Sequence, residues 1–337
     1  MPLNAGNALS ADLIGLSLPM NDRYERVSKR IEFGALLAQE KTEPKIELAL
    51  LDDNCDAALV PDLIKKFIDA KAIVGLPCFK VATEIARTLK NVNNPAPILT
   101  LRTRNFALKR LREIEKLPII EFSNVPDAEA RAVVDFILPQ FGAKPYAILD
   151  DGSVYGRGLA DAVRLIAEET GRKPIINSNF RALQSNQRAL LRRLQKSGVE
   201  AIFVAAEPED VVTIANDLSA LNLNWPIAMG EQIALLPYAN DAKNISLSIL
   251  AVAPAIRKVL DEKFKTDVAK SESSPDPEIV LGYVMVEVAT QLIKDTNARE
   301  FDTIVGKIKL RQDSRIVLEP FELVEWSNGQ LSSVESN

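Results

Sequence analysis

Short apolar runs alternate with longer amphipathic stretches along almost the whole chain of 337 residues. The runs have the length and the flanking turn residues of buried strands, and the stretches have the 3.6-residue period of helices that cover a sheet. In the first part of the chain, the pattern predicts strands at Leu13–Leu18, Ile46–Asp52, Ala72–Gly75 and Ile98–Leu101, and helices at Val27–Gln39, Leu59–Ala70 and Val81–Leu89. This strict alternation is typical of the α/β class with parallel sheets.

A second series with the same alternation begins at residue 119. It predicts strands at Ile119–Phe122, Tyr146–Leu149, Pro174–Asn177, Ala201–Val204 and Pro226–Met229, and helices at Asp127–Gln140, Gly158–Thr170, Asn186–Lys196 and Asp210–Leu221. Two series of similar size predict two lobes, each a doubly wound parallel sheet. Because an open α/β sheet binds ligands beyond the carboxyl ends of its strands, we expect a cleft between the lobes.

The remaining part of the chain is expected to add four elements. They are helices at Ile256–Phe264 and Glu278–Lys294 and strands at Arg315–Leu318 and Phe321–Trp326. The loop Ser271–Pro277 between the two helices is rich in Ser, Pro and Asp, so it is expected to be exposed and mobile.

Missing residue types narrow the functional classes. The chain contains no histidine, which excludes Ser-His-Asp and Cys-His catalysis and His-ligated zinc. It contains neither a G-x-x-x-x-G-K-[ST] loop nor a strand followed by G-x-G-x-x-G, so no cofactor or metal is expected. The adjacent carboxylates of Asp150 and Asp151 would be needed for acid/base catalysis, but neighbours at a strand end usually point to opposite sides. The sequence therefore predicts a protein without catalytic residues.

Charge and hydropathy limit the partners. A formal net charge of -5 argues against general nucleic-acid binding, which needs a basic face. The basic residues Arg188, Arg192, Arg193 and Lys196 fit a solvated helix face. No apolar run approaches the roughly 18 residues of a membrane span, and no secretory signal is visible. The chain is therefore expected to be either a mature form that was given a new initiator Met or a cytosolic protein.

The only two cysteines follow two consecutive predicted strands. Cys55 comes just after Ile46–Asp52, and Cys78 comes just after Ala72–Gly75. In a right-handed βαβ unit the two strands lie about 4.8 Å apart, which is close to the roughly 5.5 Å between the Cα atoms of a disulfide. A bridge is geometrically reasonable and would persist only in an oxidising compartment. The alternative is a pair of buried thiols in a cytosolic protein.

Several segments, taken in order, resemble the type I periplasmic solute-binding proteins of the leucine/isoleucine/valine-binding group, the extracytoplasmic receptors of amino-acid ABC transporters. The similarity covers nearly the whole chain and depends on the order and spacing of the segments Ile14–Pro19, Phe33–Ala35, Leu51–Asp56, Val74–Cys78, Leu149–Leu159 and Trp326–Gly329.

This resemblance implies two lobes joined by three crossovers, near Phe122, Leu250 and Pro320. The first lobe would combine residues 11–121 with 251–320, and the second 122–250 with 321–337. It also implies a disulfide between Cys55 and Cys78, hinge closure around a small solute, an ABC permease as partner, a monomeric state and a periplasmic location.

The first-lobe turns depart from what the resemblance implies. An amino-acid receptor needs hydroxyls and helix N-terminal amides for the carboxylate of its ligand. The turn behind the second cysteine instead contains Phe79 and Lys80, and the turn after the fourth strand contains Arg102, Thr103 and Arg104. The two arginines are expected either to contact an anionic ligand or to lie in surface charge or salt bridges. Tyr24, in the first turn, either closes over the ligand or is an ordinary surface tyrosine.

The second-lobe turns agree better with the resemblance. Tyr155 lies at a helix-entry turn, and Glu207 and Glu231 follow two consecutive predicted strands. By resemblance, Glu231 is the acceptor for a ligand ammonium group, and the alternative is a solvated loop carboxylate.

The sequence thus predicts a receptor that captures an amino acid, branched-chain by family, or a related small carboxylate. The alternative is a ligand-sensing or regulatory domain of the same fold that no longer binds amino acids.

Overall fold

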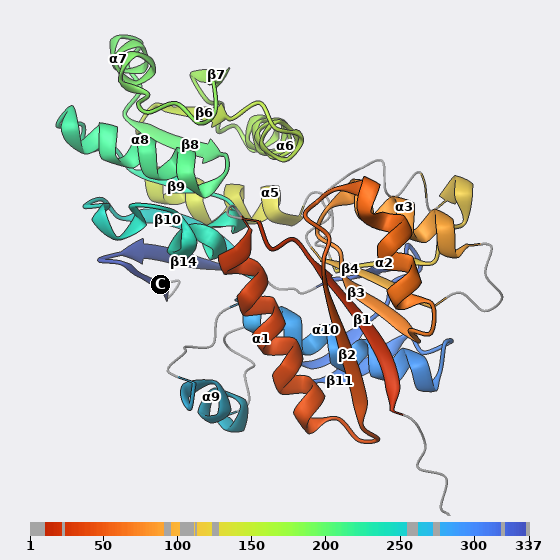
Figure 1. Cartoon of the computed structure of the whole chain (residues 1–337). Helices are drawn as coiled ribbons and strands as arrows, with labels where there is room; N and C mark the ends of the chain where they lie inside the picture. Colours follow the sequence, from red (N-terminus) through yellow and green to blue (C-terminus); the bar gives the residue numbers. More distant parts are fainter. Residues whose placement is uncertain are drawn as a thin grey trace, which may run out of the picture. The chain divides into compact units, whose positions relative to one another are not determined.

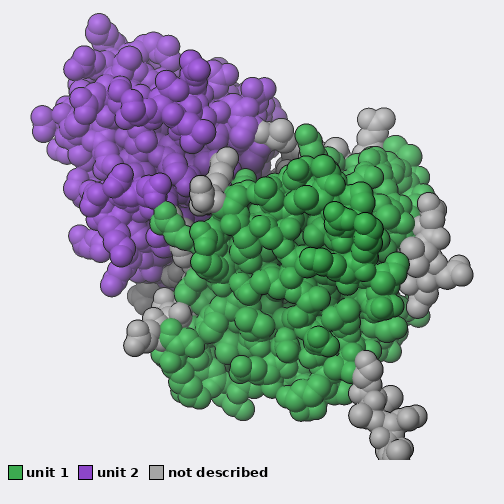
Figure 2. All heavy atoms as spheres, viewed as in Figure 1, with its two compact units in different colours: residues 1–123, 259–317 green, residues 124–258, 318–337 purple. Residues whose placement is uncertain are grey.

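The computed structural model describes residues 11–21, 24–90, 96–101, 111, 113–122, 128–254, 262–271, 277–317 and 321–334. The chain forms two compact units (Figure 2). Unit 1 combines residues 1–123 with 259–317, and unit 2 combines residues 124–258 with 318–337.

Unit 1 contains a six-stranded sheet in the order β13-β5-β4-β3-β1-β2, with all pairs parallel (Figure 1). Its strands are β1 (Asp12–Leu18), β2 (Ile46–Asp52), β3 (Ala72–Gly75), β4 (Ile98–Leu101), β5 (Ile119–Phe122) and β13 (Arg315–Ile316). Among the described residues of unit 1, the helices with defined bounds are α1 (Glu25–Lys41), the 3-10 turn η1 (Ala57–Leu59), α2 (Val60–Phe67), α3 (Phe79–Leu89), α9 (Glu262–Ala269) and α10 (Pro277–Lys294). The strands β3 and β4 are completely buried, which explains why their apolar runs were easy to recognise.

Helices α1 and α10 cross with backbone against backbone. A Cβ atom on Gly34 would overlap the carbonyl oxygen of Ile279, and a Cβ atom on Gly282 would overlap the carbonyl oxygen of Ile31. Each helix therefore presents a glycine to the main chain of the other, and only glycine permits this approach.

A two-stranded hairpin outside the main sheet is attached to α10. It consists of β11 (Glu300–Thr303) and β12 (Gly306–Lys309). Gln291 donates to the carbonyl oxygen of Asp302 at 2.8 Å and accepts from its amide at 3.1 Å, and Glu287 accepts from the amide of Ile304 at 2.9 Å. One face of α10 thus satisfies backbone groups that the hairpin itself leaves unpaired.

Unit 2 contains a seven-stranded sheet in the order β15-β14-β10-β9-β8-β6-β7. Its parallel strands are β6 (Tyr146–Asp150), β7 (Ile176–Asn179), β8 (Ala201–Ala205), β9 (Ile227–Met229) and β10 (Ile249–Pro254), and antiparallel pairing adds β14 (Phe321–Ser327) and β15 (Gln330–Ser333).

Two hydrophobic clusters cover the two faces of this sheet. One face packs against α5 (Ala128–Ala132), the π-helical turn η2 (Val133–Ile137), η3 (Leu138–Phe141) and α6 (Val154–Glu169). The other packs against α7 (Arg188–Lys196), α8 (Pro208–Ala220), η4 (Glu231–Tyr238) and η5 (Ala242–Asn244). The clefts of an α/β sheet form beyond its carboxyl ends, so the turns after β6, β8 and β9 are the functional candidates of this unit.

Several predicted bounds differ from those of the structure; helix α6, for example, begins four residues before the predicted Gly158. The crossover expected near Leu250 falls inside β10, which pairs with β9 and β14, so unit 2 continues to residue 258. The single helix expected over Asp127–Gln140 is divided into three helical types, and Pro139, which cannot donate an intrahelical hydrogen bond, lies in the last. The strand expected at Pro174–Asn177 begins and ends two residues later. Most of the loop Ser271–Pro277 and much of helix Ile256–Phe264 lie outside the described residues.

Candidate functional site

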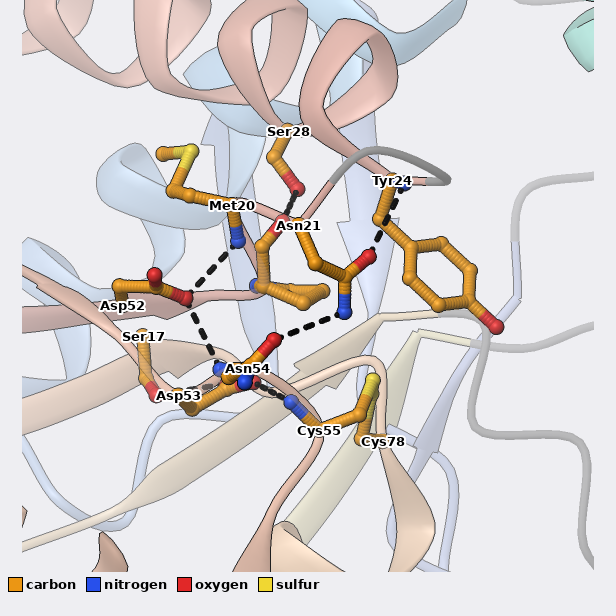
Figure 3. Close-up of a disulfide and its surroundings, with 11 residues drawn as sticks. Ser17, Met20, Asn21, Tyr24, Ser28, Asp52, Asp53, Asn54, Cys55 and Cys78 are labelled. Atoms are coloured by element: carbon orange, nitrogen blue, oxygen red, sulfur yellow. Dashed lines mark hydrogen bonds between the residues drawn. A yellow bond between two sulfur atoms is a disulfide. The ribbon is translucent and has the colours of Figure 1, made fainter.

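In unit 1, the turns after β1 and β2 are joined by polar side chains (Figure 3). Asp52 accepts hydrogen bonds from the amides of Met20 and Asn54, both at 2.9 Å. The side chain of Asn21 donates to that of Asn54 at 3.0 Å. These bonds fix the two turns to one another at the carboxyl edge of the sheet.

The disulfide between Cys55 and Cys78 joins the turn after β2 to the start of α3 (Figure 3). The two Cα atoms are 5.4 Å apart, within the range that a disulfide requires. The predicted bridge is thus present, but the expectation that the two strands before it are neighbours was wrong, because β1 lies between β2 and β3.

Asp53 lies beneath this bridge and is completely buried. Its carboxylate accepts from the amide of Cys55 at 2.9 Å and from the hydroxyl of Ser17 at 2.8 Å. Burial raises the pKa of Asp53, and the two hydrogen bonds oppose that rise. Asp53, Cys55 and Cys78 offer three possible metal-ligating atoms within 4.8 Å, but both sulfur atoms are consumed by the disulfide. Asp53 therefore positions the bridged turn.

The other unit 1 candidates occupy different environments. Tyr24 precedes α1 and is 37% exposed, Phe79 packs against the hydrophobic cluster around β3, and Lys80 is exposed on the first turn of α3. Arg102, Thr103 and Arg104 lie outside the described residues.

In unit 2, one carboxylate connects two of the predicted candidates. Oε1 of Glu129, on α5, accepts from the hydroxyl of Tyr155 at 2.7 Å and from the backbone amide of Glu231 at 2.7 Å. A Cβ atom on Gly230 would collide with Oε1 of Glu129, and it would lie 2.8 Å from the Tyr155 hydroxyl. Glycine is required at this position because the carboxylate and the phenol occupy the space beside it.

Glu129 was not among the predicted site residues, although the sequence contained a signal for it. It lies four residues before Val133 and eight before Ile137, so a helix places it in line with buried apolar side chains. A carboxylate in such a stripe requires hydrogen-bond donors, because burial of an unpaired polar group is costly.

A second carboxylate organises the neighbouring turns. Asp151 accepts from the amide of Ser153 at 2.9 Å and from the amide of Glu207 at 3.2 Å, which connects the turns after β6 and β8. The hydroxyl of Ser153 caps α6 by accepting from the amide of Gly156 at 2.9 Å.

The neighbouring carboxylate of Asp150 accepts from the amide of Gly152 at 2.8 Å, and burial raises the pKa of Asp150. Both aspartates therefore fix the backbone of the turns at this end of the sheet.

The arrangement brings Tyr155, Glu207 and Glu231 to one edge of the unit 2 sheet. Glu231 and Glu129 are each only 8% exposed, and Glu207 precedes α8 without capping it through its side chain. An edge that carries Glu129, Asp151, Glu207 and Glu231 is suited to a cationic group, because carboxylates are strong hydrogen-bond acceptors for ammonium.

A family model described as periplasmic binding protein matches residues 14–330 of the chain. The chain belongs to this family. It is a type I member of the leucine/isoleucine/valine-binding group. The proteins of this group are substrate-binding receptors of ABC transporters; these receptors are not enzymes, and they act outside the cytoplasm. In the described part of the chain, no helix is both long and apolar enough to cross a membrane.

Two curated relatives show how far the sequence similarity extends. The chain is 20% identical over 351 residues to a leucine-, isoleucine-, valine-, threonine- and alanine-binding protein of Pseudomonas aeruginosa, covering 96% of this chain and 92% of that protein. It is 22% identical over 225 residues to the Leu/Ile/Val-binding protein BraC3 of Rhizobium johnstonii, covering 62% of this chain and 61% of that protein.

Solved structures share the fold. The substrate-binding protein LivJ of Streptococcus pneumoniae, in complex with isoleucine, superposes with a TM-score of 0.78 at 16% identity over 96% of this chain and 99% of that one. A solute-binding protein of R. palustris, in complex with benzoate, gives a TM-score of 0.73 at 16% identity over 96% of both chains. The same fold thus holds ligands with and without an ammonium group.

Proposed function

We propose that this protein is a monomeric periplasmic receptor that captures a branched-chain amino acid or a related small carboxylate between its two units. Hinge closure would enclose the solute, and the closed form would deliver it to an ABC permease. Such closure suits two units that are joined by few crossovers.

The Glu129, Tyr155 and Glu231 cluster is the observation that supports an amino acid most directly. The hydrogen bond from the Glu231 amide to Glu129 fixes the backbone at the start of η4. We infer that the Glu231 carboxylate accepts the ligand ammonium group and that Tyr155 lies beside it. Benzoate has no ammonium group and would be repelled by this acidic edge.

The ligand carboxylate is assigned to unit 1. Helix α3 is 11 residues long, and its N-cap residue, Cys78, does not cap it through its side chain. The first amides of α3 and the helix dipole favour an anion there, and Lys80 adds a positive charge on the same turn. The bulky side chain of Phe79 packs inward against the hydrophobic cluster, which leaves those amides as the polar groups of the turn.

Thermal denaturation with a panel of solutes tests this proposal. The panel contains leucine, isoleucine, valine, benzoate and 4-hydroxybenzoate. A ligand present at 100 times its Kd stabilises the folded protein by about 2.7 kcal/mol, which is readily measured as a rise in Tm. We expect the branched-chain amino acids to raise Tm and the benzoates to have no effect.

Glu231→Gln is the decisive variant, with Glu200→Gln as its control because Glu200 is an exposed carboxylate of the same unit. We expect Glu231→Gln to weaken amino-acid binding at least tenfold and Glu200→Gln to leave it unchanged. A response to benzoates alone would reject the amino acid, and no response to any solute, together with no solute retained through purification, would reject the receptor role for these ligands.

A further inference from the structure

One continuous stretch of unit 2 is basic in an otherwise acidic protein. The whole chain has 46 acidic and 41 basic side chains, yet no acidic residue occurs between Gly171 and Val199. The basic residues of this stretch are Arg172, Lys173, Arg181, Arg188, Arg192, Arg193 and Lys196. The proposed solute site uses none of them.

The fold places this stretch at one edge of the unit 2 sheet. Strand β7 is the last in the sheet order and pairs only with β6 among the described strands. Helix α7 buries Leu190, Leu191 and Leu194 against the core. In Figure 1, β7 and α7 lie at the same end of the unit. We call the exposed surface of residues 171–199 the basic edge.

Two of the seven cations of the basic edge have fixed partners. Arg188 pairs with Asp217 at 2.8 Å, and Arg172 donates to the carbonyl oxygen of Leu138 at 2.9 Å. Lys173, Arg181, Arg192, Arg193 and Lys196 are exposed, and none of their side chains forms an ion pair or hydrogen bond with any residue that the structure describes.

The neighbouring helix does not neutralise these cations. The outward positions of α8 are Glu209, Thr213, Asn216, Ser219 and Ala220, and of these only Glu209, in the first turn, carries a charge. Its other acidic residues, Asp210 and Asp217, are buried, and Asp217 is paired with Arg188. Exposed carboxylates flank the stretch at both ends along the chain, Glu168 and Glu169 before it and Glu200 after it.

The basic edge also presents a leucine that the loop holds away from the core. Leu183 is 71% exposed and has a left-handed backbone conformation with φ 57°. Its amide donates to Asp210 at 2.7 Å, and the loop is closed by a 2.9 Å bond from Gln187 to the carbonyl oxygen of Arg181. A non-glycine residue is rarely found at this φ unless surrounding contacts hold it there.

We propose that the basic edge binds the anionic headgroups of a membrane surface and that Leu183 inserts into the interfacial region. Lysine and arginine near an anionic bilayer each add to the attraction, and an exposed apolar side chain adds a second, salt-independent contribution. Cationic side chains without fixed partners can follow lipid headgroups, which move laterally. The carboxylates of an acidic protein partner have fixed positions and would favour cations that are themselves held in place. The family acts beside membrane permeases, so a bilayer is within reach. This proposal is independent of the solute.

Co-sedimentation of the full chain with lipid vesicles tests it. The vesicles are pure phosphatidylcholine or phosphatidylcholine with about 30% phosphatidylglycerol, at low and at high salt. We expect binding to the anionic vesicles only, weakened by salt because the Debye length shortens. Removing three cations with Arg192→Gln, Arg193→Gln and Lys196→Gln should reduce the partition coefficient at least tenfold.

Two controls distinguish binding through the basic edge from a general effect of the protein's net charge. The triple variant Lys66→Gln, Lys71→Gln and Lys90→Gln removes three exposed cations of unit 1 and should bind vesicles like the wild type. Leu183→Ala should weaken binding severalfold at both salt concentrations. No binding of the wild type to anionic vesicles, or an equal loss in both triple variants, would overturn the proposal. Binding to soluble polyglutamate without binding to vesicles would assign the basic edge to an acidic protein and would also overturn it.

Discussion

The hydroxyl group of Tyr155 donates a 2.7 Å hydrogen bond to Oε1 of Glu129, and these two residues come from different helices on the same face of the unit 2 sheet. The same oxygen accepts from the backbone of Glu231. Glu129 thus connects α6 to the turn after β9, and the geometry of the candidate site depends on a residue that does not itself lie in either turn.

A double-mutant cycle measures this connection. We expect Tyr155→Phe to lower the free energy of unfolding of unit 2 by about 1 kcal/mol and Glu129→Ala to lower it by about 2 kcal/mol, because the alanine leaves two donors without their acceptor. The double variant should fall short of the sum by about 1 kcal/mol. Urea unfolding followed by tryptophan fluorescence reports on unit 2 alone, because both tryptophans, Trp225 and Trp326, belong to it.

Tyr146→Phe provides the control for this cycle. The hydroxyl of Tyr146 bonds to the carbonyl oxygen of Arg172 in the same unit and has no part in the Glu129 cluster. Its effect should add to that of Glu129→Ala. Equal coupling with both tyrosines would mean that the cycle reports general destabilisation.

The Cys55–Cys78 bridge is expected to stabilise unit 1 selectively. It closes a loop with a sequence separation of 23, for which the chain-entropy model gives about 3 kcal/mol. Replacing both cysteines with serine should shift the urea transition measured by far-UV circular dichroism and leave the tryptophan transition of unit 2 in place. An unchanged dichroism transition, or two free thiols titrated in the unreduced wild type, would contradict the stabilising bridge.

The contact between α1 and α10 predicts that Gly34→Ala is destabilising although alanine is the better helix former. An added methyl group would meet the carbonyl oxygen of Ile279, and the backbone cannot move as a flexible side chain can. We expect a loss of about 3 kcal/mol in the stability of unit 1, measured by urea unfolding and circular dichroism.

Leu36→Ala is the matched control on the same helix. Leu36 is 44% exposed, so its truncation should change the stability by no more than about 0.5 kcal/mol. Stabilisation by Gly34→Ala, as helix propensity alone would give, would show that the two helices are not in backbone contact.

The fold was largely predictable because most of its parallel strands are short apolar runs between turn residues. The sequence-based bounds of β2, β3, β4 and β5 agree with the structure. The strand β10 was missed because it joins the second sheet after a long irregular segment, η4 and η5, where no alternation with a helix marks it. The hairpin of β11 and β12 was missed because its short strands depend on hydrogen bonds from Gln291 and Glu287, which local pattern does not reveal.

The candidate site was less predictable than the fold, because its contacts join residues that are far apart along the chain. Tyr155, Glu207 and Glu231 could be chosen because they follow strand ends, and the structure places them at one edge. Glu129 could not be connected to Glu231, because 102 residues separate them along the chain and only the packing of α5 against the sheet brings them together.

The carboxyl group of Glu287 predicts a pH-dependent stability of unit 1. Burial raises its pKa from 4.5 to about 7, and the hydrogen bond from the amide of Ile304 partly opposes that rise. The folded state holds the proton of Glu287 more tightly than the unfolded state does. The stability that this proton contributes to folding is therefore fully present below the unfolded pKa and is lost as the pH rises through 7. The wild type should therefore lose roughly 3 kcal/mol relative to Glu287→Gln between pH 4.5 and pH 8.

Glutamine is the appropriate replacement because it keeps an oxygen acceptor for Ile304 and cannot titrate in this range. Urea unfolding of both proteins by circular dichroism at pH 5, 6, 7 and 8 gives the difference directly. Other groups with raised pKa values in unit 1, such as Asp53 and Glu32, are present in both proteins and cancel in that difference. A difference that stays constant over these four pH values would show that Glu287 is ionised throughout and that its burial does not control its protonation.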